Sequence, residues 1–341
     1  MKSGIDNYKK FLRFLGGGIV VILGILSTLG SAGIGGGNNG DATPAGALPA
    51  KISPFNFNAD NSLSAAKAAA SAMSFFPNFS AIGQEILNTL SVSDPVNSPF
   101  ELGMCANSGH SMLKWIDGDH SGDVSMGDSA TLKFTNCDMD GGGSITQGNV
   151  EIGFTNVDSD PLPNSASLNV SVNLSNTDDP DSTTIVATFK VISKTQNNSD
   201  FTIDYIANDL FDQKLTITKN GVTQLEFGCF KVTHTFNTAS GSGTFVLTPS
   251  GAINTAHSIM SFTNDNQQLS FINDTLESGT QRLLSSASPN CTSIGVPEAG
   301  ESDSSYLDID ALGGGDVLLH TFDGNDNEVN TIDTTWAALL N

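Results

Sequence analysis

The densest group of oxygen-bearing side chains lies in residues 117–128, which read D-G-D-H-S-G-D-V-S-M-G-D. This spacing matches the twelve-residue EF-hand loop, in which oxygen ligands at alternate positions converge on one Ca²⁺ ion. The predicted ligands, in order along the loop, are Asp117, Asp119, Ser121, Asp123, Ser125 and Asp128. Because all of these donors are oxygen atoms, the set favours Ca²⁺ over Zn²⁺ and would hold Mg²⁺ only weakly.

The alignment with an EF-hand gives each position a role. Asp117, Asp119 and Ser121 occupy the first, third and fifth positions, while Gly122 stands at the sixth, where the turn needs a backbone that glycine adopts at low cost. Asp128 closes the loop where glutamate is usual. Its shorter side chain reaches less far, so we expect a weaker site than in a typical EF-hand.

The remaining positions and the flanks complete this prediction. Asp123 would offer its backbone carbonyl and Ser125 would bind through a water molecule. The segment 110–116 before the loop is expected to end a helix, and 129–137 after it alternates like a strand. The sequence therefore predicts a helix–loop–strand calcium site with a stabilising role and a dissociation constant of about 10⁻⁴–10⁻³ M. The competing interpretation is an Asp/Gly-rich surface turn.

Two further segments repeat part of the pattern. Residues 138–149 begin D-M-D-G-G-G but have no acidic closing residue, and residues 323–334 have glutamate where an EF-hand needs glycine. Turns stabilised by Asp and Asn side chains explain both segments better than metal sites do.

Motifs for catalysis are weak. None of the five histidines lies in an H-E-x-x-H sequence. Gly109-His110-Ser111 begins like the nucleophile elbow of a hydrolase, but Leu113 stands where the last glycine belongs. We therefore expect a protein that is not an enzyme and rank hydrolase activity a distant third among the functions considered.

The N-terminus has the features of an export signal. Four cations precede residue 14, an uncharged run extends from Phe14 to Gly40, and small residues follow its apolar centre. We expect residues 1–32 to be a signal peptide cleaved after Ala32, with an uncleaved membrane anchor as the alternative. Residues 33–52 form a Gly/Pro-rich tether.

Charge and cysteine content agree with export to the periplasm, the outer surface or the extracellular space. The formal net charge of −22 disfavours nucleic acid and anionic lipid as partners, since both need clustered cations. The cysteines are Cys105, Cys137, Cys229 and Cys291. An even number suggests two disulfides, and although three connectivities exist, sequential pairing closes the shortest loops.

Hydrophobic periodicity divides the exported part into a helical and a β segment. Residues 53–128 contain two predicted helices, 63–73 and 80–90, separated by a break at Phe76-Pro77. From residue 129 to 341 apolar residues alternate with polar ones, which is typical of antiparallel sheets. Asn220-Gly221 is the strongest hairpin signal. The expected fold is mainly β, an antiparallel meander, sandwich or curved sheet, packed as one unit with a short N-terminal helical pair.

Several segments resemble a family of poorly characterised bacterial exported proteins, many of them lipoproteins. The similar stretches are SGDVSMGDSATLKFTNC, ITQGNVEIGF and the C-terminal GGGDVLLHTFDGNDNEVNTIDTTWAALL. The chain departs from that family because its leader lacks a lipid-acceptor cysteine. The resemblance implies an exported location and a β-rich architecture, without an activity.

These observations favour a calcium-stabilised surface or adhesion-type protein that associates with itself or with a cell-surface or matrix partner. The alternative is a periplasmic carrier, in which a curved sheet and its helices enclose a lipid or another hydrophobic ligand. Phe75, Phe76 and Phe79 would then line the mouth of the binding site.

Overall fold

The computed structural model describes most of the chain after residue 52. The described ranges are 53–92, 99–122, 125–139, 144–157, 165–178, 181–195, 200–208, 213–237, 244–255, 258–263, 266–272, 275–285 and 305–340. The predicted signal peptide, residues 1–32, and the predicted tether, residues 33–52, lie outside these ranges.

Strands dominate the described residues. The helices are α3 (Ser62–Val92) and α4 (Trp336–Leu340). The strands are β1 (Ser53–Pro54), β2 (Phe100–Glu101), β3 (His110–Ile116), β4 (Ser129–Asp138), β5 (Ile145–Val157), β6 (Ser165–Asp178), β7 (Asp181–Thr195), β8 (Asp200–Ile206), β9 (Lys214–Lys219), β10 (Val222–Asn237), β11 (Thr244–Thr255), β12 (Ser258–Phe262), β13 (Leu269–Ile272), β14 (Thr275–Ser285), β15 (Tyr306–Gly313), β16 (Asp316–Phe322) and β17 (Glu328–Thr335).

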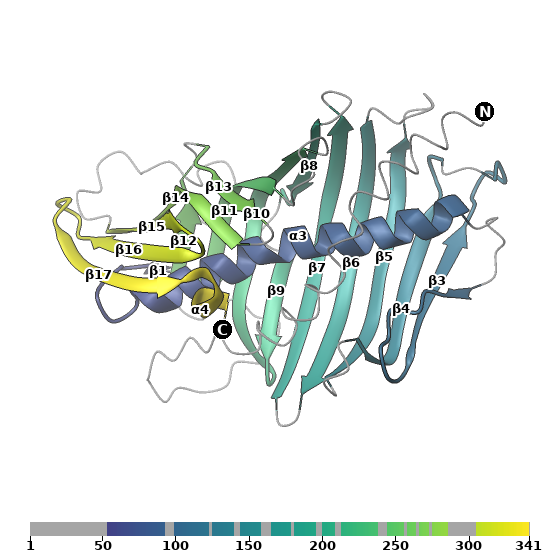
Figure 1. The fold of residues 1–341 in the computed structure, drawn as a ribbon, viewed down its shortest axis with the longest axis horizontal. Coiled ribbons are helices and arrows are strands. Elements are labelled where there is room, and N and C mark those ends of the chain that lie inside the picture. The colour runs from purple at the N-terminus through teal and green to yellow at the C-terminus, as the bar shows by residue number, and fades with distance from the viewer. Residues whose placement is uncertain are drawn as a thin grey trace.

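These strands join into one hydrogen-bonded sheet (Figure 1). Strands adjacent in the chain pair antiparallel from β2 to β7 and again from β14 to β17, and only the short β1 pairs parallel, with β12. Two positions in the sheet are each shared by two short strands. β8 and β9 both lie between β7 and β10, and β12 and β13 both lie between β11 and β14. The prediction of a mainly antiparallel β fold with an N-terminal helical segment is confirmed.

The hairpin at Asn220-Gly221 is also confirmed. The two residues have φ of 49° and 77°, and they connect β9 to β10 with Lys219 opposite Val222. Both central residues of a type I′ turn need positive φ, which Asn and Gly tolerate best.

The predicted break in the helical segment is wrong. Helix α3 runs without interruption from Ser62 to Val92 with Pro77 inside it, and it crosses the strands of the sheet (Figure 1). Proline in a helix interior costs about 3 kcal/mol because it removes one hydrogen bond and crowds the preceding turn. The tertiary packing of the flanking phenylalanines offsets this cost.

Those phenylalanines lie in the core of the described structure. Phe75, Phe76 and Phe79 are buried, and Phe76 alone contacts four rings on the sheet at centroid distances of 4.9–6.3 Å. The four rings belong to Phe189, Tyr205, Phe227 and Phe230. In this arrangement the three phenylalanines hold the helix on the sheet.

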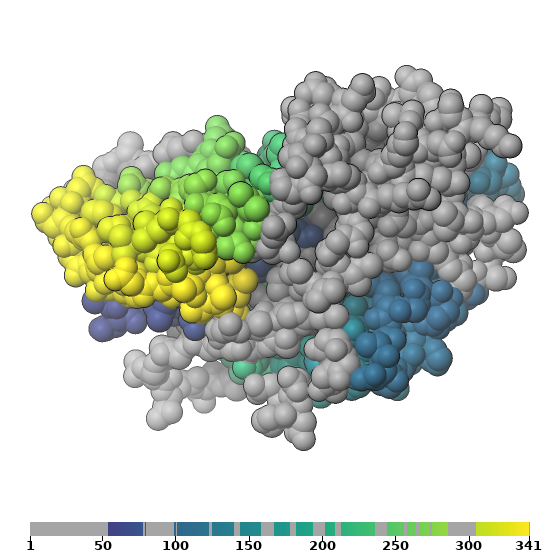
Figure 2. All heavy atoms as spheres, viewed as in Figure 1, coloured from purple at the N-terminus to yellow at the C-terminus, as the bar shows by residue number. Residues whose placement is uncertain are grey.

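Small residues let the first half of α3 approach the sheet closely. Six alanines between residues 65 and 72 are buried, and the Ser62 hydroxyl lies 2.6 Å from the Thr321 hydroxyl of β16. The C-terminal strands therefore lie beside the start of the helix, as the yellow and purple surfaces in Figure 2 show. No helix within the described residues is long and apolar enough to cross a membrane.

Candidate metal centre

The predicted calcium loop connects two strands. Residues 110–116, expected to end a helix, form β3, which pairs antiparallel with β4 from His110–Thr135 to Ile116–Ser129. The helix prediction was wrong because H-S-M-L-K-W-I alternates in burial, with Ser111, Leu113 and Trp115 facing the core. The site is therefore a strand–loop–strand hairpin, and the sheet begins before residue 129.

Three of the predicted ligands come together in this hairpin. Carboxylate oxygens of Asp117, Asp119 and Asp128 lie within 4.8 Å of one another, and these residues form the only such group of three found in the part of the chain that the structure describes. Three carboxylates this close to one another could hold a metal ion.

Backbone N–H groups orient the Asp117 carboxylate. Its two oxygens accept hydrogen bonds from Ser121 N at 3.1 Å and from Gly122 N at 2.8 Å. The loop turns back through His120 and Gly122, whose φ angles are 59° and 78°. The positive φ predicted for the sixth position is confirmed, and it aims consecutive N–H groups at the first ligand.

Asp128 is the most firmly held of the three. It is 1% exposed, and its carboxylate accepts hydrogen bonds from Gly118 N at 2.8 Å and Ser125 N at 2.7 Å. Its backbone carbonyl accepts from Phe154 N of β5 at 2.9 Å. The closing ligand is thus fixed to the sheet on one side and to both ends of the loop on the other.

Sequence reasoning gave no role to Gly118, the second residue of the loop. A Cβ atom there would lie 2.9 Å from the carbonyl oxygen of Gly127, so a larger residue would separate the two ends of the loop. Glycine at this position lets the backbone approach Asp128. The sequence signal for this close approach was the presence of a glycine beside an aspartate at both ends of the loop, in Asp117-Gly118 and in Gly127-Asp128.

The hydroxyl groups of the loop differ in their surroundings. The Ser121 hydroxyl and N–H lower the pKa of the exposed Asp119 carboxyl, and the nearby Ser125 hydroxyl adds a smaller effect. The Ser125 Oγ atom is nevertheless buried without a partner in hydrogen-bond geometry. The Ser125 side chain therefore lies near the carboxylates of Asp119 and Asp128, of which the second accepts from Ser125 N. Asp123, the remaining predicted ligand, lies outside the described residues.

The two weaker motifs contain turns held by side chains. Asp323 Oδ1 accepts hydrogen bonds from Asn325 N and Asn327 N at 2.8 and 2.9 Å, as expected for an Asx-type turn between β16 and β17. Asp138 is buried, and its backbone pairs with Ala106 and Ser108. Residues 140–143 of the first motif lie outside the described residues.

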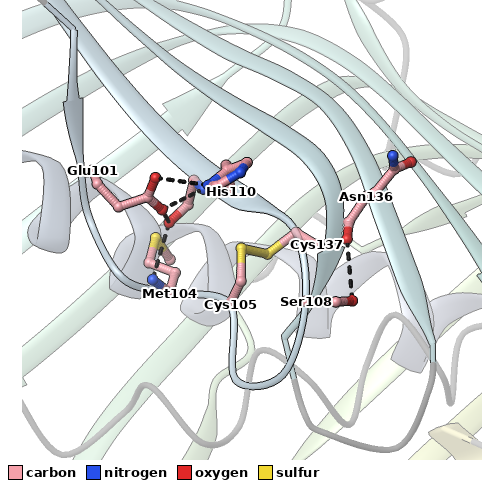
Figure 3. Close-up of a disulfide and its surroundings, with 8 residues drawn as sticks. Glu101, Met104, Cys105, Ser108, His110, Asn136 and Cys137 are labelled. Carbon is pink, nitrogen blue, oxygen red and sulfur yellow. Dashed lines mark hydrogen bonds and ion pairs between the residues drawn. A yellow bond between two sulfur atoms is a disulfide. The ribbon is translucent and has the colours of Figure 1, made fainter.

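A disulfide joins the other end of the β3–β4 hairpin to the preceding segment. Cys105 and Cys137 are bonded with their Cα atoms 5.2 Å apart, which is one of the two pairs of the sequential connectivity (Figure 3). Cys229 is also disulfide-bonded, but Cys291 lies outside the described residues, so that second pair stays a prediction. The hairpin is therefore crosslinked at one end and has the acidic loop at the other.

The residues around this disulfide connect β2 to β3. The Ser111 hydroxyl is buried, accepts a hydrogen bond from Met104 N at 2.9 Å, and lies 3.5 Å from Glu101 Oε1. His110, the next residue on the strand, is exposed and contacts the other oxygen of Glu101 through Nδ1 (Figure 3). Both residues of β3 therefore contact the Glu101 carboxylate of β2.

Comparison with known proteins gives no further assignment: no family model, no curated protein and no solved structure matches this chain.

Proposed function

We propose that the Asp117–Asp128 loop binds one Ca²⁺ ion and that the ion stabilises an exported β-sheet protein with a structural or adhesive role. The observation that supports this most is the convergence of Asp117, Asp119 and Asp128 within 4.8 Å on a hairpin whose backbone fixes two of the three carboxylates. Such an arrangement costs electrostatic repulsion without a cation, and a bound Ca²⁺ would remove that cost.

The ion would stabilise the edge of the sheet. β3 is paired with β4 along its length but with β2 only at Leu113 and Met112. A Ca²⁺ ion held by both ends of the loop would oppose separation of β3 from β4, as the Cys105–Cys137 disulfide does at the opposite end. The role is therefore structural, in the manner of weak extracellular calcium sites that are permanently filled.

The exported location and the structural or adhesive role are supported by general features. The formal charge of −22 suits a protein that interacts with cations and remains soluble. A disulfide is compatible with an oxidising compartment. The resemblance to bacterial exported proteins and the alternative of a hydrophobic-ligand carrier stay predictions. A lipid extracted from the purified protein would favour the carrier.

Calcium should bind with a stoichiometry of one and raise the stability of the protein. At 10 mM Ca²⁺ and a dissociation constant near 10⁻³ M, mass action gives a stabilisation of about 1–2 kcal/mol. Calorimetric titration measures the stoichiometry, and urea unfolding in Ca²⁺ and in EGTA measures the stabilisation. Tb³⁺ offers an optical signal, because Trp115 lies two residues before Asp117 and would sensitise its luminescence.

Asp117→Asn is the variant that tests the site. It removes the charge and retains one side-chain oxygen, which can accept from either Ser121 N or Gly122 N but not replace both carboxylate oxygens, so the calcium-dependent part of the stability should disappear. Asp323→Asn, in the turn between β16 and β17, is the matched control and should leave the calcium response unchanged. A wild-type protein with neither binding heat nor a shift in stability would reduce the loop to an acidic turn and refute the proposal.

A further inference from the structure

The face of the C-terminal strands that points away from the core carries a histidine between two carboxylates. His320 of β16 contacts Glu328 Oε1 of β17 through Nδ1 at 2.9 Å, and its Nε2 lies 3.6 Å from Oδ2 of Asp310 on β15. The side chains of His320, Glu328 and Asp310 are 25%, 44% and 30% exposed, so an ion from solution can reach them. These strands and the β3–β4 hairpin with its calcium loop lie at opposite ends of the molecule (Figure 1).

The neutral form of the imidazole cannot donate a proton to both carboxylates. It has one N–H group and one nitrogen with a lone pair. The shorter contact places the N–H on Nδ1, where it donates to Glu328 Oε1. The lone pair of Nε2 is then left beside a carboxylate oxygen of Asp310 at 3.6 Å. Two electron-rich atoms at this distance repel each other, and a cation bound to both would remove the repulsion.

Hydroxyl groups hold both carboxylates in place. Thr280 Oγ1 donates to Asp310 Oδ1 at 2.5 Å, which leaves the other oxygen, Oδ2, for the contact with His320. Thr331 Oγ1 donates to Glu328 Oε1. A metal-bound histidine usually donates its second N–H to a carboxylate, which fixes the ring and makes the ligating nitrogen more basic. The chain from Thr331 through Glu328 to His320 has this arrangement.

The neighbouring charged pair does not supply the missing cation. Asp308 lies directly opposite His320 in the β15–β16 register. Both oxygens of Asp308 are engaged by Arg282, through Nε and one terminal nitrogen, each at 2.7 Å. The guanidinium of Arg282 is therefore committed to Asp308, and the pair of Asp310 and His320 Nε2 has a carboxylate charge that a small cation can neutralise.

We propose that His320 Nε2 and Asp310 Oδ2 bind a divalent transition-metal ion of the Zn²⁺ type, with Glu328 as the positioning residue that holds the ring. One imidazole nitrogen and one carboxylate oxygen suit Zn²⁺, whereas Ca²⁺ prefers oxygen ligands alone. Water molecules complete the coordination. With two protein ligands the dissociation constant is about 10⁻⁵ M, far weaker than that of a structural zinc site with four. The ion links β15 to β16, and Glu328 extends the link to β17.

Calorimetric titration of the full chain with Zn²⁺ tests this proposal, in excess Ca²⁺ so that the proposed calcium loop is filled. His320→Gln should raise the dissociation constant at least about tenfold. His110→Gln is the matched control and should leave it unchanged, because His110 contacts Glu101 through Nδ1 in the same way but has no second carboxylate among its contacts in the described structure.

Two variants of Glu328 test its positioning role. Glu328→Ala removes the acceptor of the Nδ1–H group and should weaken zinc binding about tenfold. Glu328→Gln keeps an oxygen in that place and should restore most of the affinity. A purely structural effect on the β16–β17 hairpin would lower the melting temperature without this difference in affinity between the two variants.

Asp310→Asn should weaken binding as His320→Gln does, and it keeps the test valid if melting curves show that one of these two variants does not fold. A wild type without zinc binding, or equal losses in His320→Gln and His110→Gln, would overturn the proposal, and the space between His320 and Asp310 would then take up only a proton. Asp117→Asn should not alter zinc binding, and His320→Gln should not alter the calcium response, so the two metal proposals fail separately.

Discussion

Replacing Phe76 with alanine should lower the free energy of unfolding by about 3–5 kcal/mol. The side chain is 0% exposed and is surrounded by rings from α3, β7, β8 and β10. Its deletion removes both the burial energy of a phenyl ring and the edge-to-face contacts, and it leaves a cavity where the helix meets the sheet. Urea unfolding followed by circular dichroism measures the loss.

A second reason makes this position sensitive. Pro77 follows Phe76 directly, so the helix at this point depends on tertiary packing more than on its own hydrogen bonds. Phe322→Ala is the control, because Phe322 is a half-exposed ring on β16 that stacks on Tyr306 at 4.6 Å. It should cost clearly less than Phe76→Ala. Equal losses would mean that the aromatic cluster under α3 is not the main attachment of the helix.

The same cluster explains why the helix was predicted only in part. Local propensity gives helical segments on both sides of Phe76-Pro77 and a break between them. Local propensity takes no account of contacts with residues distant in sequence. Tyr205 and Phe230 lie more than a hundred residues from Phe76, and their ring centroids are 4.9 and 5.1 Å from that of Phe76. A single helix therefore depends on contacts that only the folded chain provides.

The strands were predictable because alternation reports directly on burial. Val170, Val172 and Leu174 are buried on one face of β6, as their spacing indicates. Alternation identifies the face of each residue but not the neighbours of each strand. The sharing of one position by β8 and β9 could not be derived from it, since both strands pair with different halves of β7 and β10.

The candidate site was predicted in its residues but not in its setting. The loop spacing brought together Asp117, Asp119 and Asp128, and the turn at Gly122 has the expected positive φ. The error concerned the residues before the loop, where a resemblance to EF-hands suggested a helix although Ser111, Leu113 and Trp115 alternate. The alternation of residues 110–116 was the better guide to their structure, because a hairpin of this size needs no flanking helix.

The protein should lose about 2 kcal/mol of stability between pH 6.5 and pH 5 because of one buried histidine. His234 of β10 is 6% exposed and faces the core, where its ring meets Phe245 edge to face at 5.0 Å. Burial lowers the pKa of this imidazole from 6.5 to about 4. Below pH 6.5 the unfolded chain binds a proton that the folded protein does not, so stability falls by about 1.4 kcal/mol per pH unit until about pH 4.

The pH range distinguishes this histidine from the acidic groups. Carboxyl groups with lowered pKa, such as Glu101, weaken the fold only below their ordinary value of 4.5, so the interval from pH 6.5 to 5 reports mainly on histidine. His234→Leu should flatten the pH dependence of the unfolding free energy in this interval, whatever its effect on stability at pH 7. His110→Gln, at a side chain 71% exposed, should leave the slope as in the wild type. If both variants retain the wild-type slope, the acid sensitivity arises elsewhere, and His234 is not kept neutral by the core.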